Sequence, residues 1–265
     1  MKTTWTDICV NLTNKRFDKD REEVINQAVE ADVKRMLVTG TNLEHSRQAV
    51  KLANAYPDHL KATAGCHPHD AKEMTAASWV ALEELIRSPE VVTVGECGLD
   101  FDRNFSPADV QLEVFERQIQ LAIKYQKPLL LHERSAHDAM LSLLQKYREQ
   151  LTTLVIHCFT GTREQVKRYI ELDIYIGVTG WVCDERRNHD LLDALNDIPL
   201  NRLMVETDAP YLTPRNLKPK PKNGRNLPSV VPHIGKELAS HYQVSPSELQ
   251  SITTQNSIDC FNWPL

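Results

Sequence analysis

The stretch Val91–Asp102 reads VVTVGECGLDFD. Its first part is rich in β-branched residues and predicts a buried strand. Its second part brings Glu96, Asp100 and Asp102 together around two glycines. An unsatisfied polar group at the mouth of an apolar strand costs on the order of 2–7 kcal/mol, and an ion costs more. The stretch therefore predicts a strand that leads into a site where negative charge is needed.

Eight short apolar runs, this one included, are spaced along the chain, and each ends in polar residues, glycine or proline. They cover Trp5–Leu12, Arg35–Thr41, Lys61–His67, Val91–Leu99, Pro128–His132, Leu154–Phe159, Asp173–Thr179 and Leu203–Thr207. Between them, apolar residues recur at helical spacing. The runs are almost continuously apolar, which is typical of parallel strands covered by helices.

Eight strand–helix units in 265 residues predict a single domain, residues 1–265, of the α/β class with a TIM-like (β/α)8 barrel. No Gly-x-Gly-x-x-Gly motif follows the first strand, which disfavours an open Rossmann-type sheet. Ser106 and Ser245 each precede a proline and, three positions on, an acid, so both predict helix starts. Thr162 with Gln165 predicts a third helix start through a capping box.

The composition limits the partners. A net charge of −5 argues against a general electrostatic attachment to nucleic acid or an anionic membrane, although a local basic patch remains compatible with it. The first residues, MKTTWTDICV, lack the apolar segment of a signal peptide, and no apolar run is long enough for a membrane span. We expect a soluble, cytoplasmic protein. Its six cysteines form no Cys-x-x-Cys pair, so we expect them to be reduced and mostly buried.

In a barrel of this type the active site collects at the C-terminal ends of the strands. The predicted strand ends carry Asp7, Cys9, Asn11, His67, His69, Glu96, His132, His157 and Asp208. These are ligand types for a divalent cation, and we expect Glu96, His132, His157 and Asp208 to converge on one. Each residue alone also has an ordinary explanation. A rim histidine is common, Glu96 could pair with Arg134, and Asp208 could cap a helix.

The segment after Asp208 is basic. It contains no acid before Glu237 and carries Arg215, Lys218, Lys220, Lys222, Arg225 and Lys236 among several prolines. A stiff loop of this kind over the barrel mouth suits a phosphate chain, with Arg215 and Lys218 as contacts, whereas the alternative is a solvated surface loop. Trp181 and Phe101 are candidates either for stacking on unpaired bases or for ordinary packing.

Several phrases of the sequence resemble the TatD-type metal-dependent deoxyribonucleases, a branch of the amidohydrolase superfamily with a TIM-like barrel. They are GECGLDF, HER after the apolar PLLL, HCFTG, IGVTGWVCDERR and VETDAPYL, and the similarity runs from VNLT to NSIDCFNW near the end of the chain. The resemblance implies a magnesium-dependent 3′–5′ exonuclease that acts on single-stranded DNA and RNA, without a membrane partner. We expect it to be a monomer.

The resemblance also implies residue roles. Glu96, His132 and His157 correspond to metal ligands, and Asp208 to the carboxylate that binds metal or activates the attacking water. Glu96 and Asp208 are thus the expected catalytic residues. His67 and His69 match a His-Pro-His element near the substrate phosphate, and Arg134 matches an arginine suited to contact phosphate.

The first strand departs from the family pattern. Most members have a His-x-His pair there, which helps to hold a second metal ion, but this chain has Cys9 and Asn11. Asparagine is a weak ligand, and cysteine binds zinc only as a thiolate. We expect one firmly bound ion, Mg²⁺ with Mn²⁺ or Zn²⁺ as alternatives, and a weak second site. Cys9 is interpreted as a packing residue and Asn11 as a substrate contact.

Two other functions fit the same residues. The first is a small-molecule amidohydrolase that cleaves an amide, lactone or phosphotriester, although the missing His-x-His pair and the basic loop count against it. The second is a non-catalytic accessory protein that binds nucleic acid.

Overall fold

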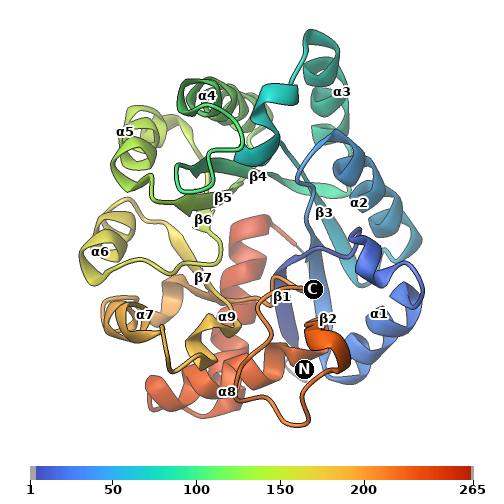
Figure 1. Ribbon diagram of the computed structural model, residues 1–265, viewed down its shortest axis with the longest axis vertical. Helices are drawn as coiled ribbons and strands as arrows, with labels where there is room; N and C mark the ends of the chain where they lie inside the picture. The colour runs from blue at the N-terminus through green and yellow to red at the C-terminus, as the bar shows by residue number, and fades with distance from the viewer. Residues whose placement is uncertain (1–3, 264–265) are drawn as a thin grey trace.

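The computed structural model describes residues 4–263 and confirms the predicted (β/α)8 barrel (Figure 1). Eight parallel strands follow one another in chain order around the barrel. They are β1 (Trp5–Val10), β2 (Val33–Val38), β3 (Leu60–Ala64), β4 (Val91–Asp100), β5 (Leu129–Arg134), β6 (Leu154–Ile156), β7 (Tyr175–Val178) and β8 (Leu203–Val205).

Helices surround the strands, as a parallel barrel requires (Figure 1). They are α1 (Arg21–Glu30), α2 (Leu43–Ala55), α3 (Ala76–Ile86), α4 (Ala108–Tyr125), α5 (His137–Tyr147), α6 (Arg163–Glu171), α7 (His189–Leu195), α8 (Val231–His241) and α9 (Pro246–Phe261). Short 3-10 turns include η2 (Pro68–Glu73) and η4 (Gly180–Cys183) in the loops at the barrel mouth. No helix within residues 4–263 is both long and apolar enough to span a bilayer.

Two apolar clusters hold the barrel together. The larger one lies between the strands and the surrounding helices. The smaller one joins side chains of strands on opposite sides of the barrel, among them Ile8, Leu130 and Met204, so it fills the interior. Phe261 and Trp263, at the end of α9, belong to the interior cluster, and α9 packs against β1 and β8. Apolar side chains therefore fill the barrel interior, and the mouth, at the C-terminal ends of the strands, has room for a ligand.

The last strand meets the first at a seam. Backbone hydrogen bonds run from the amide of Asp208 to the carbonyl of Cys9, and from the amide of Asn11 to the carbonyl of Ala209. Beneath them, the buried Asp7 accepts hydrogen bonds from the amide and the hydroxyl of Thr207, at 3.0 and 2.5 Å. The seam thus joins the first strand to the last just below the mouth, through residues such as Asp7 and Thr207 that are 200 positions apart in sequence.

The strands end at other residues than the apolar runs predict. β6 stops at Ile156 and β8 at Val205, earlier than expected, whereas β5 continues to Arg134. Cys158 and Asp208 have φ values of 48° and 52°, a left-handed conformation that cannot continue a strand. His157 and Asp208 therefore lie in loops just beyond their strands.

All three predicted helix starts are confirmed. Thr162 and Gln165 form the capping box of α6, and Ser245 accepts a hydrogen bond from the amide of Glu248 at the start of α9. The third helix, α4, begins at Ala108, but Ser106 does not cap it. The buried Ser106 hydroxyl donates to the carbonyl of His69 instead, so it ties η2 to the loop before α4.

The six cysteines are all free, and only Cys158 among them is partly exposed, which agrees with the prediction that they are reduced and mostly buried.

Candidate metal centre

Glu96 lies on β4 at the floor of the mouth, where only 5% of its surface is exposed. The two glycines beside it, Gly95 and Gly98, both have a φ of 138°, which side-chain-bearing residues rarely adopt. A Cβ atom on Gly95 would lie 2.5 Å from the carbonyl oxygen of Leu130, and one on Gly98 would collide with the carbonyl of His132. The glycines therefore allow β4 to approach β5 closely, which brings Glu96 next to His132.

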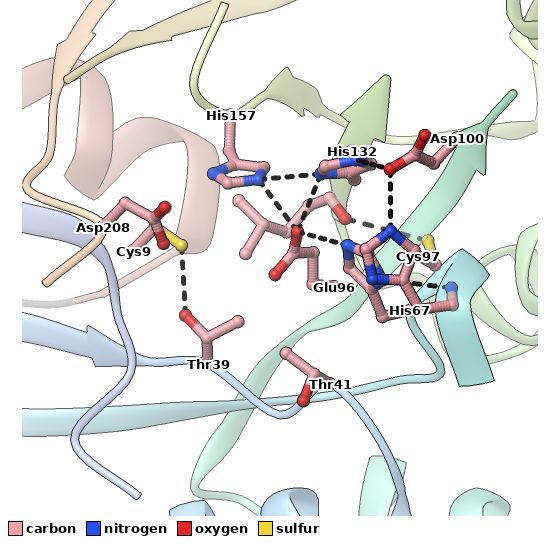
Figure 2. A network of polar contacts seen from close by, with 12 residues as sticks. Cys9, Thr39, Thr41, His67, Glu96, Cys97, Asp100, His132, His157 and Asp208 are labelled. Atoms are coloured by element: carbon pink, nitrogen blue, oxygen red, sulfur yellow. Dashed lines mark hydrogen bonds and ion pairs between the residues drawn. The ribbon is translucent and has the colours of Figure 1, made fainter. Parts of the chain in front are cut away.

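Three imidazoles surround one oxygen of this carboxylate (Figure 2). The Oε1 atom of Glu96 lies 2.9 Å from Nε2 of His157, 3.1 Å from Nδ1 of His132 and 3.3 Å from Nε2 of His67. The histidines come from the loop after β6, from β5 and from the residue before η2. The structure thus brings together Glu96, His132 and His157, three of the four residues expected to converge on one cation, and places His67 beside them.

Glu96 and the histidines around it stabilise each other's charged forms. Burial raises the pKa of Glu96, but His157 and His67 outweigh it, and the net pKa lies well below the ordinary value. Burial lowers the pKa of His157, but Glu96 outweighs it, and the net pKa lies well above the ordinary value. An ionised carboxylate among imidazoles needs a positive charge beside it. A divalent cation supplies that charge in place of the imidazole protons.

Two further carboxylates lie behind the histidines, and the sequence analysis did not assign them a role. Oδ2 of Asp100 lies 2.7 Å from Nε2 of His69 and 3.6 Å from Nε2 of His132. Oε2 of Glu206 lies 3.3 Å from Nδ1 of His157, and its other oxygen accepts a hydrogen bond from the amide of Cys158.

Asp100 and Glu206 are almost fully buried, at 1% and 0% exposure. Each faces one nitrogen of a histidine ring and leaves the other nitrogen directed at Glu96, so His132 offers Nδ1 and His157 offers Nε2. The signal that could have found them lies in two motifs of the sequence, since Asp100 closes GECGLD and Glu206 opens ETD.

Asp208 lies across the pocket from His132, beside Cys9 (Figure 2). Its Oδ1 atom accepts a hydrogen bond of 2.8 Å from the side-chain amide of Asn11. Burial raises the pKa of Asp208 to about 7, helped by Glu96 and opposed by His157 and Asn11. A carboxylate with a pKa near neutrality is suited to accept a proton.

The donor atoms fit a divalent cation. Two groups of residues each offer three ligand atoms that lie within 4.8 Å of one another. The first group is His67, Glu96 and His132, and the second is Cys9, Glu96 and His157. Imidazole nitrogen together with carboxylate oxygen is a ligand set used by zinc and other transition metals, and carboxylate oxygens also suit magnesium and manganese.

The centre opens into a cavity of about 800 Å³. Eight of the ten predicted site residues line it, namely Asn11, His67, His69, Glu96, His132, Arg134, His157 and Asp208. Arg215 and Lys218 do not line it. The guanidinium of Arg134 is half-exposed and pairs with Asp102 at 2.9 Å, so it stands at the rim of the cavity.

The basic segment after Asp208 begins at the cavity, where Tyr211 and Leu212 contribute to the lining. Further on, Arg215 pairs with Glu185 at 2.8 Å and Arg225 pairs with Asp20 at 2.5 Å, so both serve to hold the loop. Lys218 and Lys220 are exposed, and no described acid pairs with either. The Lys222 side chain lies outside the described part of the structure.

Aromatic residues stand at the rim. Trp181 on η4 lines the cavity, and the guanidinium of Arg187 covers its ring at 4.1 Å. Phe101 packs against the core instead of facing the cavity. Tyr211 and Phe105, which sequence reasoning missed, are 48% and 56% exposed, and Phe105 packs edge-on against His69 at 4.7 Å. Nothing in the sequence distinguishes these two from core aromatics.

Comparison with known proteins adds independent evidence. Residues 6–262 match the family model described as TatD related DNase. A protein of Edwardsiella piscicida named 3′-5′ ssDNA/RNA exonuclease TatD is 49% identical over 255 residues, which cover 96% of this chain and 98% of that protein. The protein of the same name from Salmonella typhimurium is 47% identical over 255 residues, with the same coverage.

Solved structures give the same result. A TatD homologue from Escherichia coli K12 superposes with a TM-score of 0.91 at 27% identity, over the full length of both chains. A phosphotriesterase homology protein from Escherichia coli, complexed with phosphate in its active site, has a TM-score of 0.64 at 14% identity over 98% of this chain and 99% of that one, and shares the fold.

Proposed function

Because this chain belongs to the TatD-related DNase family, we propose that it is a metal-dependent nuclease that degrades single-stranded DNA and RNA from the 3′ end. The observation that carries this proposal is the ring of three imidazoles around Glu96 at the floor of a cavity of about 800 Å³. The whole chain, residues 1–265, acts as one hydrolase domain. We further propose that it works as a monomer in the cytoplasm.

Glu96, His132, His157 and Asp208 would hold the metal ion. When bound, the ion polarises a phosphoryl oxygen and lowers the pKa of a water molecule. Magnesium is the proposed ion, and manganese or zinc also suits the mixture of imidazole and carboxylate ligands. Neither Asn11 nor Cys9 is a good ligand for a hard ion, so the proposal includes one firmly held magnesium ion and a weak second position.

Side chains of this protein would accept the proton of the water and neutralise the charge of the phosphate. Asp208, whose pKa is raised to about 7 by burial, accepts the proton of the attacking water. Asn11 holds this carboxylate in place through Oδ1, which leaves Oδ2 to face the water. His67, His69 and Arg134 line the cavity and would neutralise the charge that develops on the phosphate.

The substrate path follows from the rim. A single strand that enters the cavity passes the exposed Tyr211 ring and Trp181, on which bases can stack. Arg215 and Lys218 lie further along the same loop and would contact the phosphates of the incoming strand. Their distance from the cavity lining makes them contacts for the strand and not for the reacting phosphate.

A product ladder tests the proposal. Single-stranded DNA and RNA, labelled in turn at either end, are incubated with the protein and a series of divalent ions. A 5′ label is expected to yield a ladder that shortens stepwise, with EDTA as the control that stops it. Glu96→Ala and His157→Ala are expected to lower the rate at least about 10³-fold with unchanged circular dichroism. Variants with full activity, or wild-type protein that binds strands but never shortens them, would refute the assignment.

A further inference from the structure

We propose that the mouth of the barrel has two cation positions of unlike chemistry, and that the second one, formed by Cys9, Glu96 and His157, selects a thiophilic ion such as Zn²⁺ or Cd²⁺. This inference concerns metal binding alone and does not depend on the nuclease activity. It departs from the interpretation of Cys9 as a packing residue.

The geometry places the thiol among the ligands. The sulfur of Cys9, a carboxylate oxygen of Glu96 and a ring nitrogen of His157 lie within 4.8 Å of one another. All three residues are buried. Figure 2 shows Cys9 and Asp208 on one side of Glu96, and His67 and His132 on the other. The two groups of donors therefore flank the same carboxylate.

The Cys9 side chain is free to serve as a ligand. It forms no disulfide, and its sulfur lies 3.2 Å from the hydroxyl of Thr39. That hydroxyl can donate to a thiolate as well as accept from a thiol. On binding, the sulfur–metal bond forms as the S–H bond breaks, the proton passes to solvent and the ion gives up a water molecule. No oxidation or reduction is involved.

The ligand type determines which ion enters. Sulfur, imidazole nitrogen and carboxylate oxygen together suit zinc, whereas magnesium prefers oxygen ligands and has little affinity for a thiolate. The two donor groups share only Glu96. When one ion is bound, His157 is available to it. When a second ion is bound next to Cys9, His157 serves that ion and His67 completes the first position together with His132.

Cadmium is the probe, because a cadmium–thiolate bond gives a charge-transfer absorption in the ultraviolet. Metal-free protein is titrated with Cd²⁺, and in parallel with Mn²⁺, and bound metal is counted by equilibrium dialysis. Wild-type protein is expected to bind two Cd²⁺ but one Mn²⁺ per chain and to develop the absorption. Cys9→Ser is expected to bind one Cd²⁺ and to lose the absorption.

Cys158→Ser is the matched control, because this thiol lines the same cavity next to His157 but belongs to neither donor group. It should keep both the absorption and the second Cd²⁺. Wild-type protein that binds one Cd²⁺ at saturation, or absorption that persists in Cys9→Ser, overturns the proposal. If Cys9→Ser does not fold, cadmium X-ray absorption spectroscopy of Cys158→Ser tests the proposal in its place. A spectrum that shows no sulfur bound to the metal also overturns the proposal.

Discussion

At the scale of single residues, the ligands depend on the carboxylates behind them. Sequence reasoning found Glu96, His132 and His157 because each stands at the end of an apolar run. It could not tell which nitrogen of each ring faces the centre, since that is decided by Asp100 and Glu206, which are distant in sequence from the rings they face. It also gave His67 only a role at the phosphate, whereas this side chain lies 3.3 Å from Glu96.

We expect Asp100→Asn and Glu206→Gln each to weaken Mn²⁺ binding about 10–100-fold. Without the carboxylate, each histidine ring loses the buried negative charge that faces its second nitrogen, at 3.6 Å for His132 and 3.3 Å for His157. The measurement is isothermal titration of metal-free protein. Glu116→Gln is the control, because Glu116 pairs with Lys146 on the surface and should leave the affinity unchanged. Unchanged affinity in both variants of the centre would show that the histidines are held by packing alone.

The pKa of Asp208, raised to about 7 by burial, predicts how the activity depends on pH. The carboxylate accepts a proton only when ionised, so kcat/KM should rise with pH and then level off. The rising limb should lie below pH 7 in the metal-bound protein, because a bound cation lowers the pKa of a neighbouring carboxylate. The hydrogen bond from Asn11 lowers the pKa of Asp208. Asn11→Ala should therefore shift the limb to higher pH, as measured by pH profiles at saturating metal. A profile that Asn11→Ala leaves in place would remove Asp208 from the role of base.

At the scale of elements, the pairing of β4 with β5 positions the centre. The sequence predicted both strands, and also the capping residues Thr162 and Ser245, because these signals are local. It did not predict where the strands end or that Ser106 bonds to His69, because these features depend on contacts between loops. The sequence alone does not show why the glycines of GECG are needed. In the structure, a side chain at either position would collide with the backbone of β5.

Gly98→Ala should therefore damage both the stability and the centre. Its methyl group would meet the His132 carbonyl, in addition to the strain of a φ of 138°. Gly224→Ala is the control, because Gly224 also has a positive φ, of 60°, but a Cβ there would meet nothing within 4 Å. In denaturant unfolding, we expect Gly98→Ala to lose roughly 1–3 kcal/mol more than Gly224→Ala, and to bind Mn²⁺ more weakly. Equal losses of unfolding free energy in the two variants would mean that β5 moves aside for the methyl group without a measurable loss of stability.

At the scale of the whole molecule, the barrel was predictable because eight apolar runs of similar spacing leave few alternatives. The placement of the basic segment was not. Its charges looked unopposed in sequence, but Arg215 and Arg225 find Glu185 and Asp20 in other parts of the chain. Such pairings depend on which loops become neighbours at the mouth, and a local pattern contains no information about that.

The seam between β1 and β8 predicts a dependence of stability on pH. Burial raises the pKa of Asp7 from 3.8 to about 8, so the folded protein holds a proton there that the unfolded chain releases above about pH 4. This contribution to stability is complete below the unfolded value and is lost as pH rises towards 8, with a slope of about 1.4 kcal/mol per pH unit.

Asp7→Asn should remove that slope, because an asparagine does not titrate. Its Oδ1 can still accept from the Thr207 amide, and its Nδ2 can donate to the Thr207 hydroxyl oxygen. Urea unfolding between pH 5 and 8 measures the slope. Asp58→Asn, at an exposed position, is the control and should follow the wild type. If the unfolding free energy of Asp7→Asn depends on pH as steeply as that of the wild type, a group other than Asp7 is responsible for the dependence.

The seam has a consequence for biosynthesis. Cys9 and Asn11 leave the ribosome early, whereas Asp208, to which they bond, emerges only after three quarters of the chain has been translated. A nascent or prematurely terminated polypeptide therefore carries the histidines but lacks a finished centre.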